Sequence, residues 1–141
     1  MEDSFGLLIR LVFGTMFLAA GASKLSDLGE FAEAIKHYKL IPGATAGAVA
    51  RGVAVTEAAL GTVLLLGAAI PVAGLLGSGL LVIFAFAMAI NLIRGRQIPC
   101  GCKRESEPIQ IKHIVRNAAG VAALIALTRL PVHPWSIDNL F

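Results

Sequence analysis

Four long apolar stretches, separated by shorter polar segments, constrain this chain more than any other feature of its sequence. They cover residues 5–22, 53–70, 72–93 and 114–130. A helix needs about 20 mostly apolar residues to cross a bilayer, where lipid offers unpaired backbone groups no other partner. The composition agrees, because only 15% of the 141 residues are charged, against about a quarter in soluble domains. The sequence therefore predicts an all-α integral membrane four-helix bundle that forms a single domain over residues 1–141.

Small residues and a short connection indicate how these helices pack. Only the region of Ile70 and Pro71 separates the second stretch from the third, which predicts a tight antiparallel hairpin. Small residues recur inside the stretches: Gly14, Gly21, Gly61, Gly67, Gly74, Gly77 and Gly79, and later Ala119, Gly120, Ala122 and Ala123. In lipid such residues let helix backbones approach closely, and this replaces the missing hydrophobic drive between helices. We therefore expect close helix packing at these glycines.

The segment 26–39 differs from the four stretches because it is amphipathic. Asp27 and Glu30 form a start that resembles a capping box, and Pro42 ends the segment. Its apolar residues on one face are Leu28, Phe31, Ile35 and Tyr38. This pattern predicts a short interfacial helix between the first and second spans. Such a helix either covers the mouth of the bundle or serves as a passive connector.

The distribution of basic residues predicts the orientation of the chain. The connections after the first and third stretches hold most of them: Lys24, Lys36, Lys39, Arg51, Arg94, Arg96, Lys103, Arg104 and Lys112. The other side has only Arg10 and Arg129, near helix ends where they can snorkel. The positive-inside rule then places both basic connections in the cytoplasm. The acidic start, Glu2 and Asp3, is unlike a signal peptide, so we expect the first span to be retained.

The two cysteines of the chain carry its most distinctive chemistry. Cys100 and Cys102 flank Gly101 in the connection that follows the third stretch. Such thiols form a disulfide when a turn brings their Cα atoms within about 4.4–6.8 Å, and glycine permits that turn. Lys103 and Arg104 favour the thiolate, which attacks disulfides and binds soft metals. We therefore predict a redox or thiol-ligand role for the pair.

Other site chemistries are less well supported by the sequence. A structural zinc site normally needs four ligands, and only His113 offers an obvious third, so we predict no metal site. The basic residues lack accompanying aromatic platforms, so we expect no nucleic-acid binding.

Polar residues inside the stretches, or just after the first of them, gather at the end of the predicted bundle where the cysteines lie. They are Lys24, Glu57, Asn91, Arg116 and Asn117, with Arg94 close by. A carboxylate in lipid is costly without a partner, so Glu57 is expected to pair with Arg116 or Lys24. Asn91 and Asn117 are expected to complete the hydrogen bonds. The group is either a structural ion-pair network or a polar pocket that holds a small ligand or a proton.

These residues together resemble those of a known family. The segments concerned are Gly21-Ala22-Ser23-Lys24-Leu25, Glu57-Ala58-Ala59-Leu60-Gly61, Asn91-Leu92-Ile93-Arg94-Gly95-Arg96, Cys100-Gly101-Cys102 and Arg116-Asn117. The chain resembles, over nearly its whole length, the MauE family of methylamine-utilisation membrane proteins, within the DoxX-like group. The resemblance implies a multi-pass protein of the bacterial inner membrane that works with thioredoxin-like partners in disulfide formation in a periplasmic enzyme. A periplasmic partner would place the thiols outside, opposite to the charge count.

The bundle also looks like that of the vitamin K epoxide reductase group, which uses a membrane quinone. This chain departs from that group because it has no second cysteine pair to pass electrons onward. It departs from many MauE relatives because Lys103 stands where they carry an aromatic residue.

The leading functional hypothesis is a membrane thiol–disulfide oxidoreductase in which Cys100 and Cys102 exchange electrons with a thioredoxin-like protein. Turnover then needs an outside electron source or sink, which is a membrane quinone or a second protein, and we predict no tightly bound cofactor. One alternative is a transporter or binder of a soft metal or sulfur species that uses the same thiols as ligands. Another is a non-enzymatic assembly partner. The oligomeric state, monomer or homo-oligomer, stays open.

Overall fold

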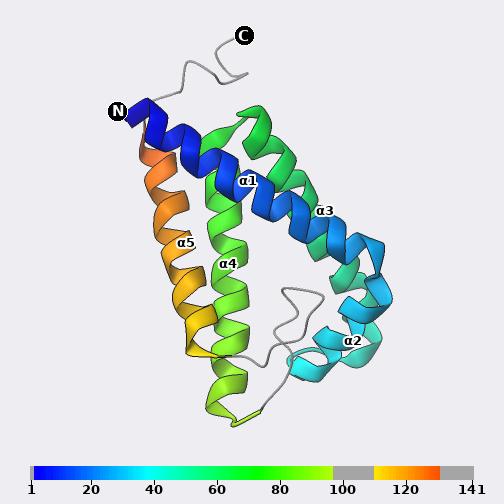
Figure 1. Ribbon diagram of the computed structural model, residues 1–141. Coiled ribbons are helices and arrows are strands. Elements are labelled where there is room, and N and C mark those ends of the chain that lie inside the picture. The colour runs from blue at the N-terminus through cyan, green and yellow to red at the C-terminus, as the bar shows by residue number, and fades with distance from the viewer. Residues whose placement is uncertain (1, 97–109, 131–141) are drawn as a thin grey trace.

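The computed structural model of this chain describes residues 2–96 and 110–130, and these residues fold into helices and short connections (Figure 1). The helices are α1 (Glu2–Ser26), α2 (Leu28–Tyr38), α3 (Ala46–Leu66), α4 (Ile70–Ile93) and α5 (Ile111–Arg129), with a 3-10 turn, η1, at Gly43–Thr45. Four of the helices, α1, α3, α4 and α5, are long and apolar enough to cross a membrane. The predicted all-α membrane bundle is therefore confirmed.

The helix bounds differ from the apolar stretches in ways that local chemistry explains. The third helix in the chain, α3, was expected at 53–70 but begins at Ala46, because the helix continues into the small residues that precede Val53. It ends at Leu66, because Gly67 takes a left-handed conformation with φ of 72° and its N–H bonds back to Leu64. Hydropathy alone does not register such a cap.

Glycine contacts join α1 to α3 over much of their length. A Cβ atom added to Gly21 would collide with the backbone of Ala58, and one added to Gly61 would collide with the backbone of Leu18. A Cβ atom on Gly14 would lie 3.2 Å from the carbonyl oxygen of Gly61. Close packing is confirmed at Gly14, Gly21 and Gly61, but not at Gly79, where an added Cβ atom would meet no described atom within 4 Å.

The bundle consists of two helix pairs rather than the expected central hairpin. The pairs in extensive contact are α1 with α3 and α4 with α5, whereas α3 and α4 share few contacts. Figure 1 shows α3 and α4 diverging from the turn that joins them. The short connection at 67–69 makes α3 and α4 consecutive helices that run in opposite directions. The close contacts at the glycines of α1, however, determine that α3 packs against α1. The prediction of a tight hairpin was wrong.

The short helix α2 packs mainly against α3 and touches α1 and α4, at the end of the bundle marked by Ser26, Ala46, Ile93 and Ile111 (Figure 1). We call this end the α2 end. The side chain of Asp27 caps α2 by accepting a hydrogen bond of 2.9 Å from the backbone N–H of Glu30. Its apolar face is half-buried while Glu30 and Lys36 are exposed, as predicted.

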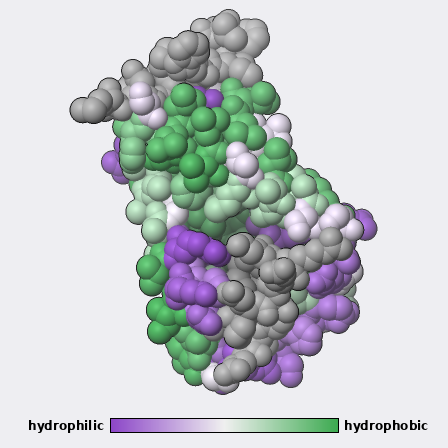
Figure 2. Space-filling view, in the orientation of Figure 1, coloured by the Kyte–Doolittle hydropathy of each residue, from purple (hydrophilic) through white to green (hydrophobic). Residues whose placement is uncertain are grey.

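The surface of the bundle suits a lipid environment. Large apolar side chains point outward from the spans, including Leu75 and Phe86, each 67% exposed. Figure 2 shows hydrophilic residues gathered around the α2 end, while apolar residues cover much of the remaining visible face. The core is a cluster that includes Phe17, Leu64 and Leu124. This is a multi-pass membrane protein.

Candidate functional site

A buried ion pair joins α1 to α3. The Nζ atom of Lys24 lies 2.7 Å from Oε2 of Glu57, and the two side chains are only 8% and 3% exposed. The approach of α1 to α3 at Gly21, one turn before Lys24, brings the ammonium within reach of the carboxylate. Of the two partners predicted for Glu57, Lys24 is confirmed. Arg116 is wrong, because it is exposed on α5, which packs against α4.

Glu57 also lies deeper than expected. The sequence predicted that its span begins at Val53, four residues before Glu57, but α3 begins at Ala46, which puts Glu57 about three turns from that end. Lys24 stands in the last turn of α1 and therefore reaches inward from the α2 end to meet it. Of the described residues that the sequence predicted for this site, Glu57 is thus the one farthest along its helix from the α2 end.

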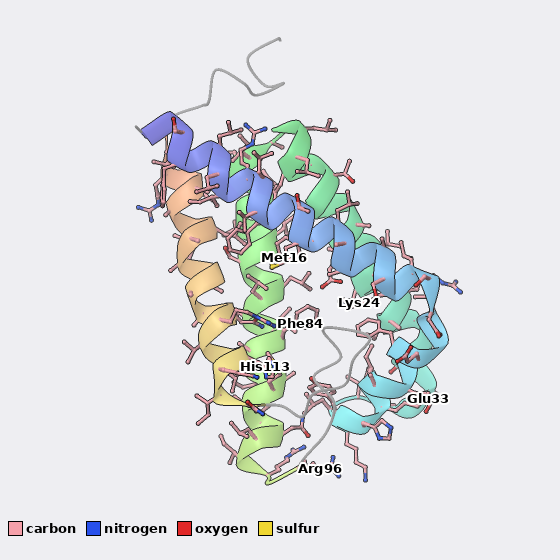
Figure 3. The ribbon with its side chains drawn as sticks, in the orientation of Figure 1. Met16, Lys24, Glu33, Phe84, Arg96 and His113 are labelled. Atoms are coloured by element: carbon pink, nitrogen blue, oxygen red, sulfur yellow. The ribbon has the colours of Figure 1, made fainter. Side chains whose placement is uncertain are left out.

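Two aromatic rings flank the Lys24 ammonium. Nζ lies 5.2 Å from the ring centroid of Phe31 on α2 and 5.8 Å from that of Phe84 on α4. Figure 3 shows Lys24 at the end of α1 and Phe84 on α4. Both distances allow attraction between the cation and the ring faces. Lys24 therefore contacts groups on α2, α3 and α4, and links the two helix pairs.

The two asparagines do not join the ion pair. Asn91 donates from Nδ2 to the carbonyl oxygen of Ala87 at 3.0 Å, while its buried Oδ1 has no partner among the described residues. Asn117 donates to the carbonyl oxygen of Leu81 at 3.5 Å and so contacts α4 from α5. The prediction that they complete the hydrogen bonds of Glu57 was wrong. Each binds backbone carbonyl groups instead.

The arginines that follow α4 and the histidine that begins α5 have separate roles. Arg94 is exposed, and Arg96 donates to the carbonyl oxygen of His37 at 3.4 Å, which fixes the end of α4 beside the end of α2. The ring of His113 accepts a hydrogen bond from the backbone N–H of Gln110 at 3.1 Å. Figure 3 places Arg96 and His113 at the α2 end.

A pocket opens at this end, between α2, the start of α3 and the C-terminal half of α4. It holds about 770 Å³ of space, part of which is open to the outside. Its walls are almost entirely apolar, and Lys24 is the one charged residue among the described residues that line it. The lining residues are Lys24, Phe31, Ala34, Ile35, Tyr38, Leu40, Ile41, Val49, Val53, Ile83, Phe84, Ala87 and Met88. Of the two alternatives that the sequence left open, the ion pair is present, and the described residues of the pocket beside it are mainly apolar.

The predicted cysteine site lies outside the described residues, as do its basic neighbours. It comprises Cys100, Cys102, Lys103 and Arg104. The chain leaves the described part at Arg96 and returns at Gln110, and both positions are at the α2 end. The role of the cysteines therefore stays a prediction. No group of three or more potential metal ligands occurs within residues 2–96 and 110–130.

Sequence reasoning missed the role of Arg10. It was expected to snorkel at the far end, but it is only 2% exposed and donates from Nε to the carbonyl oxygen of Leu64 at 3.1 Å. A second bond of 3.4 Å runs from Nη2 to the carbonyl oxygen of Leu65. The guanidinium thus satisfies the C-terminal carbonyl groups of α3. The available signal was its position inside an apolar stretch, where a charged group needs a partner.

Comparison with known proteins gives consistent matches. The model of the family described as "Methylamine utilisation protein MauE" matches residues 2–130. The chain is 34% identical to methylamine utilization protein MauE of Paracoccus denitrificans over 127 residues, which cover 87% of this chain and 68% of that protein. The protein of the same name from Methylophilus methylotrophus is 31% identical over 144 residues, covering 98% and 76%. No solved structure matches significantly.

Proposed function

The chain belongs to the MauE family, and from this premise we propose that it is a membrane thiol–disulfide oxidoreductase whose Cys100 and Cys102 exchange electrons with a thioredoxin-like partner. The observation that carries the proposal is the position of the only two cysteines in the sequence. They stand two residues apart, in a segment that leaves and re-enters the bundle at the end that holds the pocket and the buried ion pair.

The exchange proceeds by thiolate attack. A thiolate of the reduced partner attacks one sulfur of the Cys100–Cys102 disulfide, a mixed disulfide forms, and the other cysteine leaves as a thiolate. The second partner thiolate then attacks the mixed disulfide, so the partner is oxidised and both cysteines of this chain are reduced. The reverse steps reduce a partner disulfide. Lys103 and Arg104 stabilise the thiolates electrostatically.

The setting of the reaction is part of the proposal. The relatives are named for methylamine utilization, and we propose the same physiological context in a bacterial inner membrane. The basic connections, with the cysteines, face the cytoplasm. In the oxidising direction two electrons and two protons must leave the thiols in each cycle, so an acceptor outside the chain completes turnover.

Trapping experiments test this proposal. Cys100→Ser and Cys102→Ser are each expressed in cells, where one of them should accumulate a mixed disulfide with a thioredoxin-like protein that dissociates on reduction. The Cys100→Ser/Cys102→Ser double variant is the matched control and should trap nothing. Purified wild type should show a two-electron reduction potential when equilibrated with thiol buffers and alkylated with a mass-tagging maleimide.

The other hypotheses predict different results in the same experiments. Stoichiometric binding of Hg(II), Cu(I) or Zn(II) that needs both thiols, without a trapped partner, would establish a soft-metal binder and refute the oxidoreductase. Full cellular function in the double serine variant would establish an assembly role. Labelling of intact cells with a membrane-impermeant maleimide reports the side of the membrane on which the thiols lie.

A further inference from the structure

The apolar pocket at the α2 end has properties that the thiol chemistry alone does not explain. It is a partly open hollow with almost entirely apolar walls, placed between helices of both pairs. Two side chains at its rim are both apolar and exposed, Ile83 at 63% and Val49 at 39%. In a membrane protein such surfaces face acyl chains, so an apolar molecule dissolved in the bilayer reaches the pocket without crossing water.

Lys24 gives this apolar pocket one point of polar recognition. An ammonium group has three N–H donors, and one of them binds Glu57 at 2.7 Å. Within the described residues Lys24 makes no second hydrogen bond, and its other neighbours are the faces of Phe31 and Phe84. The group therefore retains donors for an acceptor atom of a molecule that enters the pocket.

The charge of the ion pair selects the kind of acceptor. Lys24 and Glu57 neutralise each other, both almost completely buried. A carboxylate or phosphate placed beside them would leave a net negative charge among apolar side chains, which is costly. A neutral carbonyl oxygen takes the hydrogen bond without that cost. The rings of Phe31 and Phe84 offer flat apolar surfaces against which a planar ring packs.

We propose that this pocket binds a lipid-soluble quinone, with a ring carbonyl oxygen accepting a hydrogen bond from the ammonium of Lys24. The inference rests on the proposed function, because it names the acceptor of the electrons that leave the thiols. The reaction balances. The thiols of Cys100 and Cys102 lose two electrons and two protons as the S–S bond forms, and the quinone gains both to become the hydroquinone.

Equilibrium binding of decylubiquinone to the purified full-length protein in detergent tests the site independently of activity. The wild type should bind one decylubiquinone, and decanoate, which carries an anionic head on the same chain, should not compete. Ala87→Phe fills the pocket and should abolish binding. Val82→Phe is the matched control, because Val82 lies on the same helix, is 50% exposed and is absent from the pocket wall. It should bind as the wild type does.

The Lys24→Met/Glu57→Gln double variant tests the polar contact without leaving a charge unpaired in the core. It should weaken decylubiquinone binding about tenfold or more, because a hydrogen bond from a charged donor is lost. Binding that is unchanged in both Ala87→Phe and the double variant would place the quinone elsewhere and overturn the inference. Preferential binding of decanoate would overturn it as well, in favour of a fatty-acid site.

The outcomes separate this inference from the proposed function. If Cys100 and Cys102 trap a partner while no decylubiquinone binds, the oxidoreductase stands and the quinone site is refuted. If decylubiquinone binds in the pocket while the thiols show no exchange, the site stands and the proposed function fails.

Discussion

Removal of one member of the buried ion pair should destabilise the bundle far more than removal of both. Lys24→Met leaves the carboxylate of Glu57, only 3% exposed, without its partner at 2.7 Å. Breaking a buried pair in this way costs about 3–5 kcal/mol, because an uncompensated charge stays in the interior. That is a large part of a typical free energy of unfolding of about 5–15 kcal/mol. The Lys24→Met variant should therefore be close to unfolded under mild conditions.

The reverse change, Glu57→Leu, should be similarly harmful, because it leaves the ammonium of Lys24 buried and unpaired. The Lys24→Met/Glu57→Leu double variant replaces the pair by apolar side chains of comparable size. Such replacements are often neutral, so the double variant should exceed each single variant in free energy of unfolding by about 2 kcal/mol or more. Its remaining loss reflects the contacts of the ammonium with Phe31 and Phe84.

Reversible unfolding in mixed micelles, followed by circular dichroism, measures these differences. Lys36→Met is the matched control, because Lys36 forms an ion pair of 2.6 Å with Glu33 that is exposed to solvent. It should leave the unfolding curve unchanged. Equal stability of Lys24→Met and Lys36→Met would refute the reasoning, since the buried position of the first pair would then have no energetic consequence. Strict additivity of the two single changes would refute it too.

Three further predictions concern the helix contacts and α2. Gly61→Leu should destabilise the protein by about 3 kcal/mol or more, because the backbone of α1 blocks the new side chain. Gly79→Leu is the control, because Gly79 faces open space, and it should have little effect in the same unfolding assay. Asp27→Ala should lower stability by about 1 kcal/mol through loss of the α2 cap, and unchanged helicity and stability would contradict that. The hydrogen bond and charge of Lys36 lower the pKa of Glu33. A carbon-13 NMR titration should therefore find the pKa of Glu33 below its ordinary value, and Lys36→Met should raise it. A pKa of Glu33 that is the same in Lys36→Met and in the wild type would disprove the contact.

Hydropathy was sufficient to predict the number and type of the membrane helices. Lipid allows a backbone with unpaired groups almost no alternative to a helix, so the apolar stretches specify the spans. The helix ends were less predictable, because they depend on local caps. Gly67 ends α3 before the apolar residues do, and Arg51 and Gly52 interrupt the apolar residues near the start of α3. Asp27, in contrast, is a cap that the sequence identified.

The partner of Glu57 could be reduced to two candidates but not to one. Lys24 and Arg116 both lie towards the same end of the chain's helices, and the choice depends on which helix packs against α3. That pairing follows from the close contacts of Gly21 and Gly61, which the sequence indicated without naming their partners. Asn91 and Asn117 were misassigned for the related reason that backbone carbonyl groups compete for amide donors.

The contact of Arg10 with the end of α3 has a mechanical consequence. Its hydrogen bonds to the carbonyl oxygens of Leu64 and Leu65 fasten the start of the α3–α4 connection to α1. The end of α3 is therefore held by a side chain of α1 as well as by the glycine contacts. Loss of the guanidinium would loosen α1 from α3 at the end of the bundle opposite the pocket.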